Sequence, residues 1–168
     1  MLHDKMDAAL NEQVKWELWS SYLYLSMSSY FQDMGLAGFA NWMKVQEQEE
    51  KFHADKFYNY TIERGGRIRL QTLEAPPSDW KTPLAAFEDT LKHEQGVTAR
   101  INGLMDLAIE LKDHATVSYL KWFIDEQVEE EASVQDILNK LKLVEGNPSA
   151  LYMLDKELAT RVFTPPVA

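Results

Sequence analysis

Acidic side chains and one histidine occupy positions where a helix would be expected to bury apolar residues. They lie in residues 49–53 and 126–130, within segments of helical periodicity. Carboxylates are rarely buried unless a cation or a metal ion neutralises them. If these side chains point inward, a positive charge must lie between them. The sequence therefore predicts a buried metal site, which the surrounding helices must assemble.

Four long segments have inward-facing residues at alternating steps of three and four, which is typical of helices in a bundle. Asp4 is expected to cap the first helix, and Thr82 with Pro83 to start the third. Gly35 fits the end of the first helix. The expected helices span about residues 4–32, 38–64, 83–111, 114–145 and 148–160, the last being short.

The connections indicate how the bundle is threaded. Short connections after the first and third helices make each an antiparallel neighbour of the next. The segment between the second and third helices contains Pro76 and Pro77, which exclude a helix, while residues 67–70 alternate like a short strand. Extended, this segment reaches about 55 Å, longer than a helix of about 40 Å. We therefore expect one all-α domain over residues 1–168, a four-helix bundle with one long crossover and a short fifth helix.

Each of the four inward stripes has one glutamate in mid-helix, at a similar depth along the bundle. His53 lies one turn after the glutamate of the second helix, and Gln127 lies one turn before that of the fourth. Four carboxylates and one imidazole favour a di-iron or di-manganese site, although zinc also binds such ligands. The four glutamates are Glu17, Glu50, Glu94 and Glu130.

Other residues near this group have two interpretations each. Glu49, Glu126 and Glu129 flank the inward positions, where they would either hold a third ion or form part of a solvated face. Tyr24 lies one heptad after Glu17 and faces the same way. It is either a core tyrosine with a satisfied hydroxyl or a group that hydrogen-bonds a metal ligand or donates an electron.

Composition limits the classes of function. The formal net charge of −10 disfavours a basic nucleic-acid surface and suits a protein that attracts cations. No apolar run approaches the ~18 residues of a membrane-spanning helix. The absence of cysteine excludes a thiolate-ligated iron module in this chain and favours the cytoplasm.

These motifs together resemble those of the bacterial non-haem ferritins, and the resemblance extends over nearly the whole chain. In that family the first iron site uses the residues that match Glu17, Glu50 and His53. The second uses the matching Glu50 as a bridge with Glu94 and Glu130, and Gln127 as a nearby hydrogen-bonding group. The third uses the residues that match Glu49, Glu126, Glu129 and Glu130.

The resemblance also implies a function and an assembly. Such a protein is a ferroxidase that oxidises Fe(II) with dioxygen or hydrogen peroxide, and it stores Fe(III) mineral in a hollow homo-oligomeric shell of 24 subunits. Residues 151–158 resemble the helix that lines the four-fold axes of these shells. Tyr24 is the best candidate for an extra electron. Haem is not expected, because the haem-ligating methionine of the related bacterioferritins has no evident counterpart.

Three alternative classes of protein fit these motifs less well. A rubrerythrin-like peroxidase would repeat Glu-x-x-His on the fourth helix, where this chain has Gln127 and Glu130. A DNA-protecting mini-ferritin places its metal site between subunits and lacks a terminal fifth helix. A purely structural bundle would keep the acidic residues on its surface and would bind no iron stoichiometrically.

Overall fold

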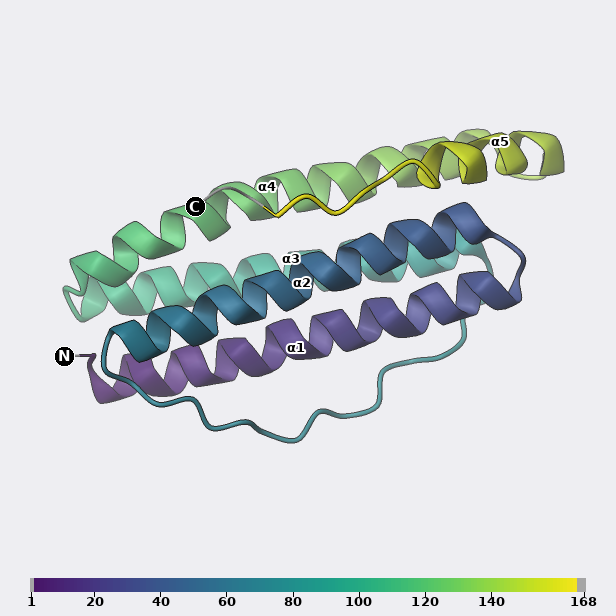
Figure 1. Cartoon of the computed structure of the whole chain (residues 1–168). Helices are drawn as coiled ribbons and strands as arrows, with labels where there is room; N and C mark the ends of the chain where they lie inside the picture. Colours follow the sequence, from purple (N-terminus) through teal and green to yellow (C-terminus); the bar gives the residue numbers. More distant parts are fainter. Residues whose placement is uncertain (1, 166–168) are drawn as a thin grey trace.

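The computed structural model describes residues 2–165. Helices are the only regular secondary structure in that part of the chain (Figure 1). The bounds of all five helices differ from the expected ones by at most two residues. The helices are α1 (Asp4–Asp33), α2 (Ala37–Glu63), α3 (Pro83–Glu110), α4 (His114–Leu143) and α5 (Pro148–Leu158).

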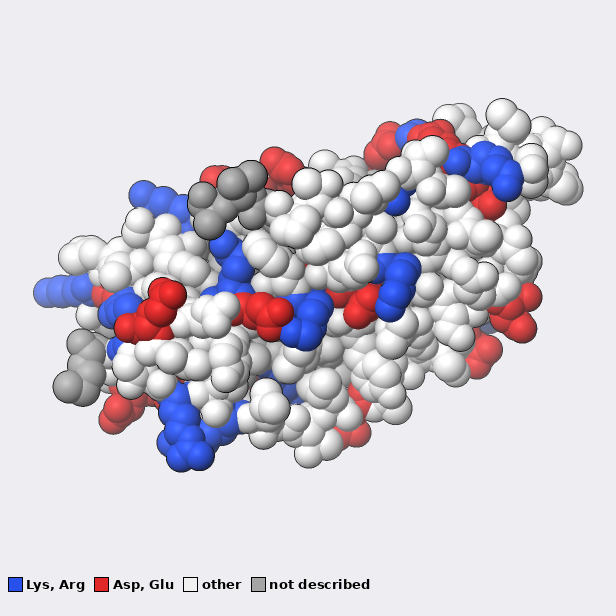
Figure 2. All heavy atoms as spheres, in the orientation of Figure 1, with Lys and Arg blue, Asp and Glu red and all other residues white. Residues whose placement is uncertain are grey.

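The long helices form a four-helix bundle with α1 against α2 and α3 against α4. Residues 64–82 form the crossover, which returns along α1 from one end of the bundle to the other (Figure 1). Helices α2 and α3 are therefore parallel, as expected. None of the helices within residues 2–165 is long and apolar enough to cross a membrane. On the face shown in Figure 2, acidic and basic side chains are interspersed.

The strand-like alternation of residues 67–70 does not lead to a strand. The structure assigns no strand there. Asn11 of α1 occupies the hydrogen-bonding positions that a partner strand would take. Its Nδ2 donates to the Arg67 carbonyl oxygen at 3.0 Å, and its Oδ1 accepts from the Arg69 amide at 2.7 Å. Because a side chain satisfies these backbone groups, no second strand is needed.

The helix ends match the expected chemistry in all but one case. Thr82 caps α3 by accepting from the Ala85 amide at 3.1 Å. Gly35 follows the end of α1 with a φ of +73°, a conformation that favours glycine. Asp4 was wrongly expected to cap α1. The cap is His3, whose Nδ1 accepts from the Lys5 amide at 3.2 Å, and Asp4 is the first helical residue.

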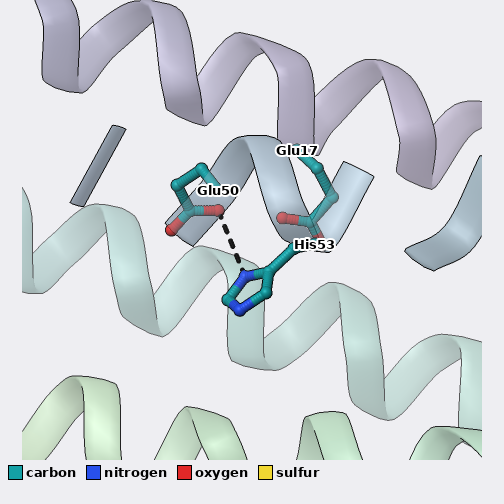
Figure 3. A group of neighbouring side chains, drawn as sticks. All are labelled: Glu17, Glu50 and His53. Carbon is teal, nitrogen blue, oxygen red and sulfur yellow. Dashed lines mark ion pairs between the residues drawn. The ribbon is translucent and has the colours of Figure 1, made fainter. Parts of the chain in front are cut away.

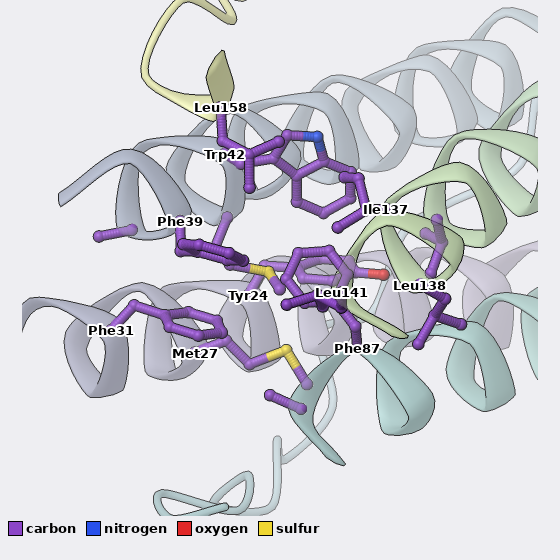
Figure 4. Packing of buried hydrophobic residues seen from close by; sticks show 14 of the residues in the cluster. Tyr24, Met27, Phe31, Phe39, Trp42, Phe87, Ile137, Leu138, Leu141 and Leu158 are labelled. Atoms are coloured by element: carbon purple, nitrogen blue, oxygen red, sulfur yellow. The ribbon is translucent and has the colours of Figure 1, made fainter. Parts of the chain in front are cut away.

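The apolar core is divided into two clusters, one toward each end of the bundle. On α1, the first cluster begins at Leu23 and the second ends at Val14, so Glu17 lies between them. On α4, Phe123 and Val134 bracket the polar segment in the same way. The first cluster includes the labelled aromatic and aliphatic residues of Figure 4. Tight packing on both sides therefore fixes the depth of the polar layer.

Helix α5 is attached to the start of α2 by a buried carboxylate. Oδ1 of Asp155 accepts from the Gly38 and Phe39 amides at 2.7 and 3.1 Å, which satisfies two free N–H groups at the N-terminus of α2. A Cβ atom at residue 38 would clash with the Asp155 carbonyl, so glycine is required. This contact determines where the chain leaves α5.

Candidate metal centre

Three predicted ligands from α1 and α2 meet in the middle of the bundle. Glu17, Glu50 and His53 are buried, and each offers a ligand atom within 4.8 Å of the other two. Figure 3 shows the three side chains directed toward one another. Nδ1 of His53 lies 3.6 Å from Oε2 of Glu50, because residues three apart on α2 share one face.

A second group of ligand atoms brings in α4. His53, Glu126 and Glu130 also offer atoms within 4.8 Å of one another. Glu94 of α3 is fully buried and belongs to neither group, but it is held beside them. The Tyr24 hydroxyl donates to one of its oxygens, and Nε2 of Gln127 lies 3.3 Å from the other. We call the five buried residues the inner cluster: Glu17, Glu50, His53, Glu94 and Glu130.

The inner cluster lacks enough positive charge for its carboxylates. Burial raises the pKa of Glu50 well above its ordinary value, and the neighbouring Glu94 and Glu17 raise it further. Burial likewise raises the pKa of Glu94 to about 7 and that of Glu130 to about 8. Oε2 of Glu17 and Oε2 of Glu50 are buried without any hydrogen-bond partner. Such a set of oxygens matches what hard divalent cations require.

Three glutamine side-chain amides hydrogen-bond to the carboxylates and orient them. Nε2 of Gln13 donates to Glu17 at 2.7 Å, and Nε2 of Gln46 donates to Glu130 at 2.7 Å, while Gln127 contacts Glu94. Sequence reasoning missed Gln13 and Gln46 as site residues. Their signal was available, since each lies one turn before a metal-ligand candidate on its own helix. Fixed amides of this kind orient metal ligands.

The remaining predicted ligands lie toward the surface, and we call Glu49, Glu126 and Glu129 the outer cluster. Glu126 is half-buried and joins the ligand atoms of Glu130, whereas Glu129 is exposed. Glu49 is half-buried and forms an ion pair with Arg161. Burial raises the pKa of Glu49, and the Arg161 guanidinium opposes that rise. The structure does not bring Glu49 and Glu129 into either group of close ligand atoms.

A tryptophan and a histidine lie beside the site without joining it. The Trp122 ring packs at 5.5 Å from that of His53, as expected of a packing residue. His93, next to Glu94 on α3, turns away to Ser20, with Nε2 at 2.8 Å from its Oγ, and packs against Tyr24. Burial lowers the pKa of His93 to about 4, so this ring is neutral.

Comparisons with known proteins agree with this geometry. The family model described as a ferritin-like domain matches residues 7–144. The bacterial non-haem ferritin of Bacteroides fragilis strain 638R is 43% identical over 161 residues, covering 96% of this chain and all of that protein. Its counterpart in Staphylococcus aureus strain MRSA252 is 40% identical over 163 residues, covering 97% of this chain and 98% of that protein.

Solved structures give the same result. A ferritin from Archaeoglobus fulgidus, engineered to a closed form, superposes with a TM-score of 0.97 at 52% identity, covering 98% of this chain and 100% of that chain. The open-pore ferritin of that archaeon gives a TM-score of 0.95 at 52% identity, over 96% of this chain and 98% of that chain. The similarity includes the short fifth helix. The chain therefore belongs to the bacterial non-haem ferritin family, and it is an iron-storage protein with ferroxidase activity.

Proposed function

We propose that the inner cluster is the ferroxidase centre of this ferritin and binds two Fe(II) ions. Glu17, Glu50 and His53 hold the first ion. The second is held by Glu94 and Glu130, with Glu50 bridging the two. The observation that supports this most strongly is the pair of buried, unpartnered oxygens on Glu17 and Glu50. A metal ion between them removes the cost of leaving both unsatisfied.

The side chains then have separate roles in oxidation. The bound Fe(II) ions pass their electrons to dioxygen or hydrogen peroxide and become Fe(III), which carboxylate oxygens favour as a hard cation. Gln127 holds one Glu94 oxygen, and Tyr24 donates its hydroxyl hydrogen to the other. Tyr24 is also the buried aromatic group placed to supply a further electron. Because only one imidazole lies in the cluster, the two iron positions are not equivalent.

A third iron position is proposed at the outer cluster, completed by Glu130. The ligand atoms of Glu126 and Glu130, which lie within 4.8 Å of each other, support it. Glu49 and Glu129 belong to the proposal through the family resemblance, and Glu49 pairs with Arg161. An ion at this position would lie between the ferroxidase centre and the surface.

We propose that the shell is a homo-oligomer of 24 subunits, since ferritins typically assemble in that form. The fully matched length and the retained α5 support this assembly. A cytoplasmic location stays a prediction from the sequence.

The test combines mass with iron content. The purified protein, freed of iron, is given Fe(II) in air in repeated small additions, and solution mass and iron per subunit are measured. We expect about 466 kDa for 24 subunits of 19.4 kDa, holding far more iron than the ligands can bind. A small oligomer that retains only two or three iron ions per subunit would contradict storage.

A further inference from the structure

The chain after α5 turns back toward the middle of the bundle (Figure 1). Hydrogen bonds from α2 hold it there, and its Arg161 pairs with Glu49 of the outer cluster. Asn41 of α2 holds this return. Its Nδ2 donates to the carbonyl oxygens of Leu158, Ala159 and Arg161 at 3.3, 3.4 and 3.0 Å. These contacts place the Arg161 side chain over the segment of α2 that contains the metal ligands.

The Arg161 guanidinium makes a full set of contacts there. Nη2 pairs with the Glu49 carboxylate, and Nη1 donates to Oε1 of Gln46 at 2.8 Å. The guanidinium lies 4.4 Å from the Trp42 ring centroid, a cation–π distance. Gln46 in turn donates to Glu130 at 2.7 Å. One amide thus separates Arg161 from a ligand of the ferroxidase centre.

We propose that Arg161 is a built-in competitor for the third metal ion. Its guanidinium occupies the cation position beside Glu49, and an ion reaches Glu49 only when Arg161 leaves. This inference rests on the third position proposed above. A guanidinium cannot lose its charge in a protein, so a divalent ion beside it would be repelled. Arg161 and the ion are therefore alternative partners of one carboxylate.

Competition with Arg161 weakens the binding of an ion at the third position. None of the five residues of the inner cluster is a lysine or an arginine, whereas the third ion must displace the Arg161 guanidinium. The third ion is therefore bound more weakly than the two inner ions and dissociates more readily. Departure of Arg161 does not require the core to open, since 23% of its side-chain surface is exposed. When Arg161 leaves, Gln46 loses the hydrogen bond from its guanidinium. Because Gln46 also donates to Glu130, the third position is linked to a ligand of the ferroxidase centre.

The test uses Zn²⁺, which does not change oxidation state, and the assembled iron-free protein. Equilibrium titration of Arg161→Gln should show two tight ions per subunit, as in the unmodified protein, and a third ion bound about 10-fold more tightly. The matched control is Arg67→Gln, which makes the same charge change at an exposed arginine of the crossover. It should bind the third ion as the unmodified protein does. In the double variant Arg161→Gln with Glu49→Gln, the gain should disappear.

A second measurement reports the displacement itself. Saturating Zn²⁺ should increase hydrogen exchange at the backbone amides of residues 160–163 in the unmodified protein. If Arg161→Gln fails to assemble, Asn41→Ala serves in its place, because it keeps the arginine but removes its anchor. It should strengthen the third ion's binding in the same direction.

Each contrary outcome has a distinct meaning. If all variants bind the third ion equally, the third position exists but Arg161 does not compete for it. If Arg161→Gln weakens the third ion, the arginine helps to build the position, and the competition is wrong. If no variant binds a third ion while two still bind tightly, the third position of the proposed function is wrong, and this inference fails with it.

Discussion

The inner and outer clusters lie side by side, yet their negative charge is compensated in different ways. In the inner cluster, Glu17 and Glu50 keep buried oxygens without a partner. In the outer cluster, Arg161 pairs with Glu49, and the positive charge of Lys56 acts on Glu126. The chain thus leaves the two unpartnered inner oxygens for a metal ion to bind, although Arg100 acts by charge on Glu17, and it pairs the outer carboxylates with its own cations.

If the outer cluster binds a third ion as proposed, this difference would let one bundle hold iron strongly at the inner cluster and more weakly at the outer cluster. Desolvated carboxylates without a protein cation favour a metal ion strongly. A carboxylate that is already paired with a protein cation favours a metal ion only by the difference between its interaction energies with the two cations. His53 offers a ligand atom to both groups of close ligand atoms, so the proposed inner and outer positions are adjacent.

The largest expected effect is on the inner cluster. Glu50→Gln keeps the shape of the bridging residue but removes its charge, so Fe(II) oxidation should slow by more than about 100-fold, beyond the loss typical of groups that only orient ligands. Stopped-flow absorbance measures the rate, with Glu63→Gln as the control because Glu63 is exposed on the same helix. Oxidation that stayed fast in Glu50→Gln would assign the chemistry elsewhere.

The second effect is a pH dependence of the metal-free protein. The pKa values of Glu50, Glu94 and Glu130 are raised above 4.5, so the folded chain holds protons that the unfolded chain releases. Stability from these groups is therefore present at low pH and is lost as pH rises from about 5 to about 8.

Calorimetry should show this loss as a fall in melting temperature of about 5 °C or more across that range. The fall should be smaller in Glu50→Gln, which has one buried acid fewer, and saturating Zn²⁺ should abolish it. An equal fall with and without Zn²⁺ would mean that the inner carboxylates are not the cause.

A smaller effect is expected for Tyr24→Phe. The variant removes the hydroxyl that donates to Glu94 but leaves the ring in the core, so oxidation should slow by about 10-fold. Zn²⁺ titration should still find two tightly bound ions per subunit. Loss of one of those ions would make Tyr24 essential for assembling the second position, which is more than an orienting hydroxyl explains.

The smallest effect is expected in the outer cluster, at Lys56→Gln. Lys56 is half-buried over the Trp122 ring, 4.2 Å from its centroid, and its charge acts on Glu126. Removal of the lysine charge should increase the affinity for the third ion about twofold, since exposed charge pairs contribute little. Zn²⁺ titrations of Lys56→Gln and Arg161→Gln under the same conditions show which of the two cations competes more strongly with the third ion. A larger gain in Lys56→Gln would make lysine the main competitor.

Helical periodicity was enough to predict the bundle and the depth of its glutamates, because the inward stripes continue through Glu17, Glu50, Glu94 and Glu130. It could not predict Arg161, which follows the last helix and meets Glu49 only through the tertiary contact of Asn41. The strand-like alternation of residues 67–70 in the crossover was uninformative for a similar reason. Alternating residues suggest a strand, but only the fold decides whether a partner strand or a side chain satisfies the backbone.

The most direct test of the inner site is anomalous diffraction from crystals soaked with Fe(II) without oxygen. We predict two iron peaks in every subunit, one among Glu17, Glu50 and His53, and one among Glu50, Glu94 and Glu130. A weaker third peak would lie beside Glu126 and Glu130. Iron found only at the protein surface, with the inner carboxylates empty, would contradict the assignment of the ferroxidase centre.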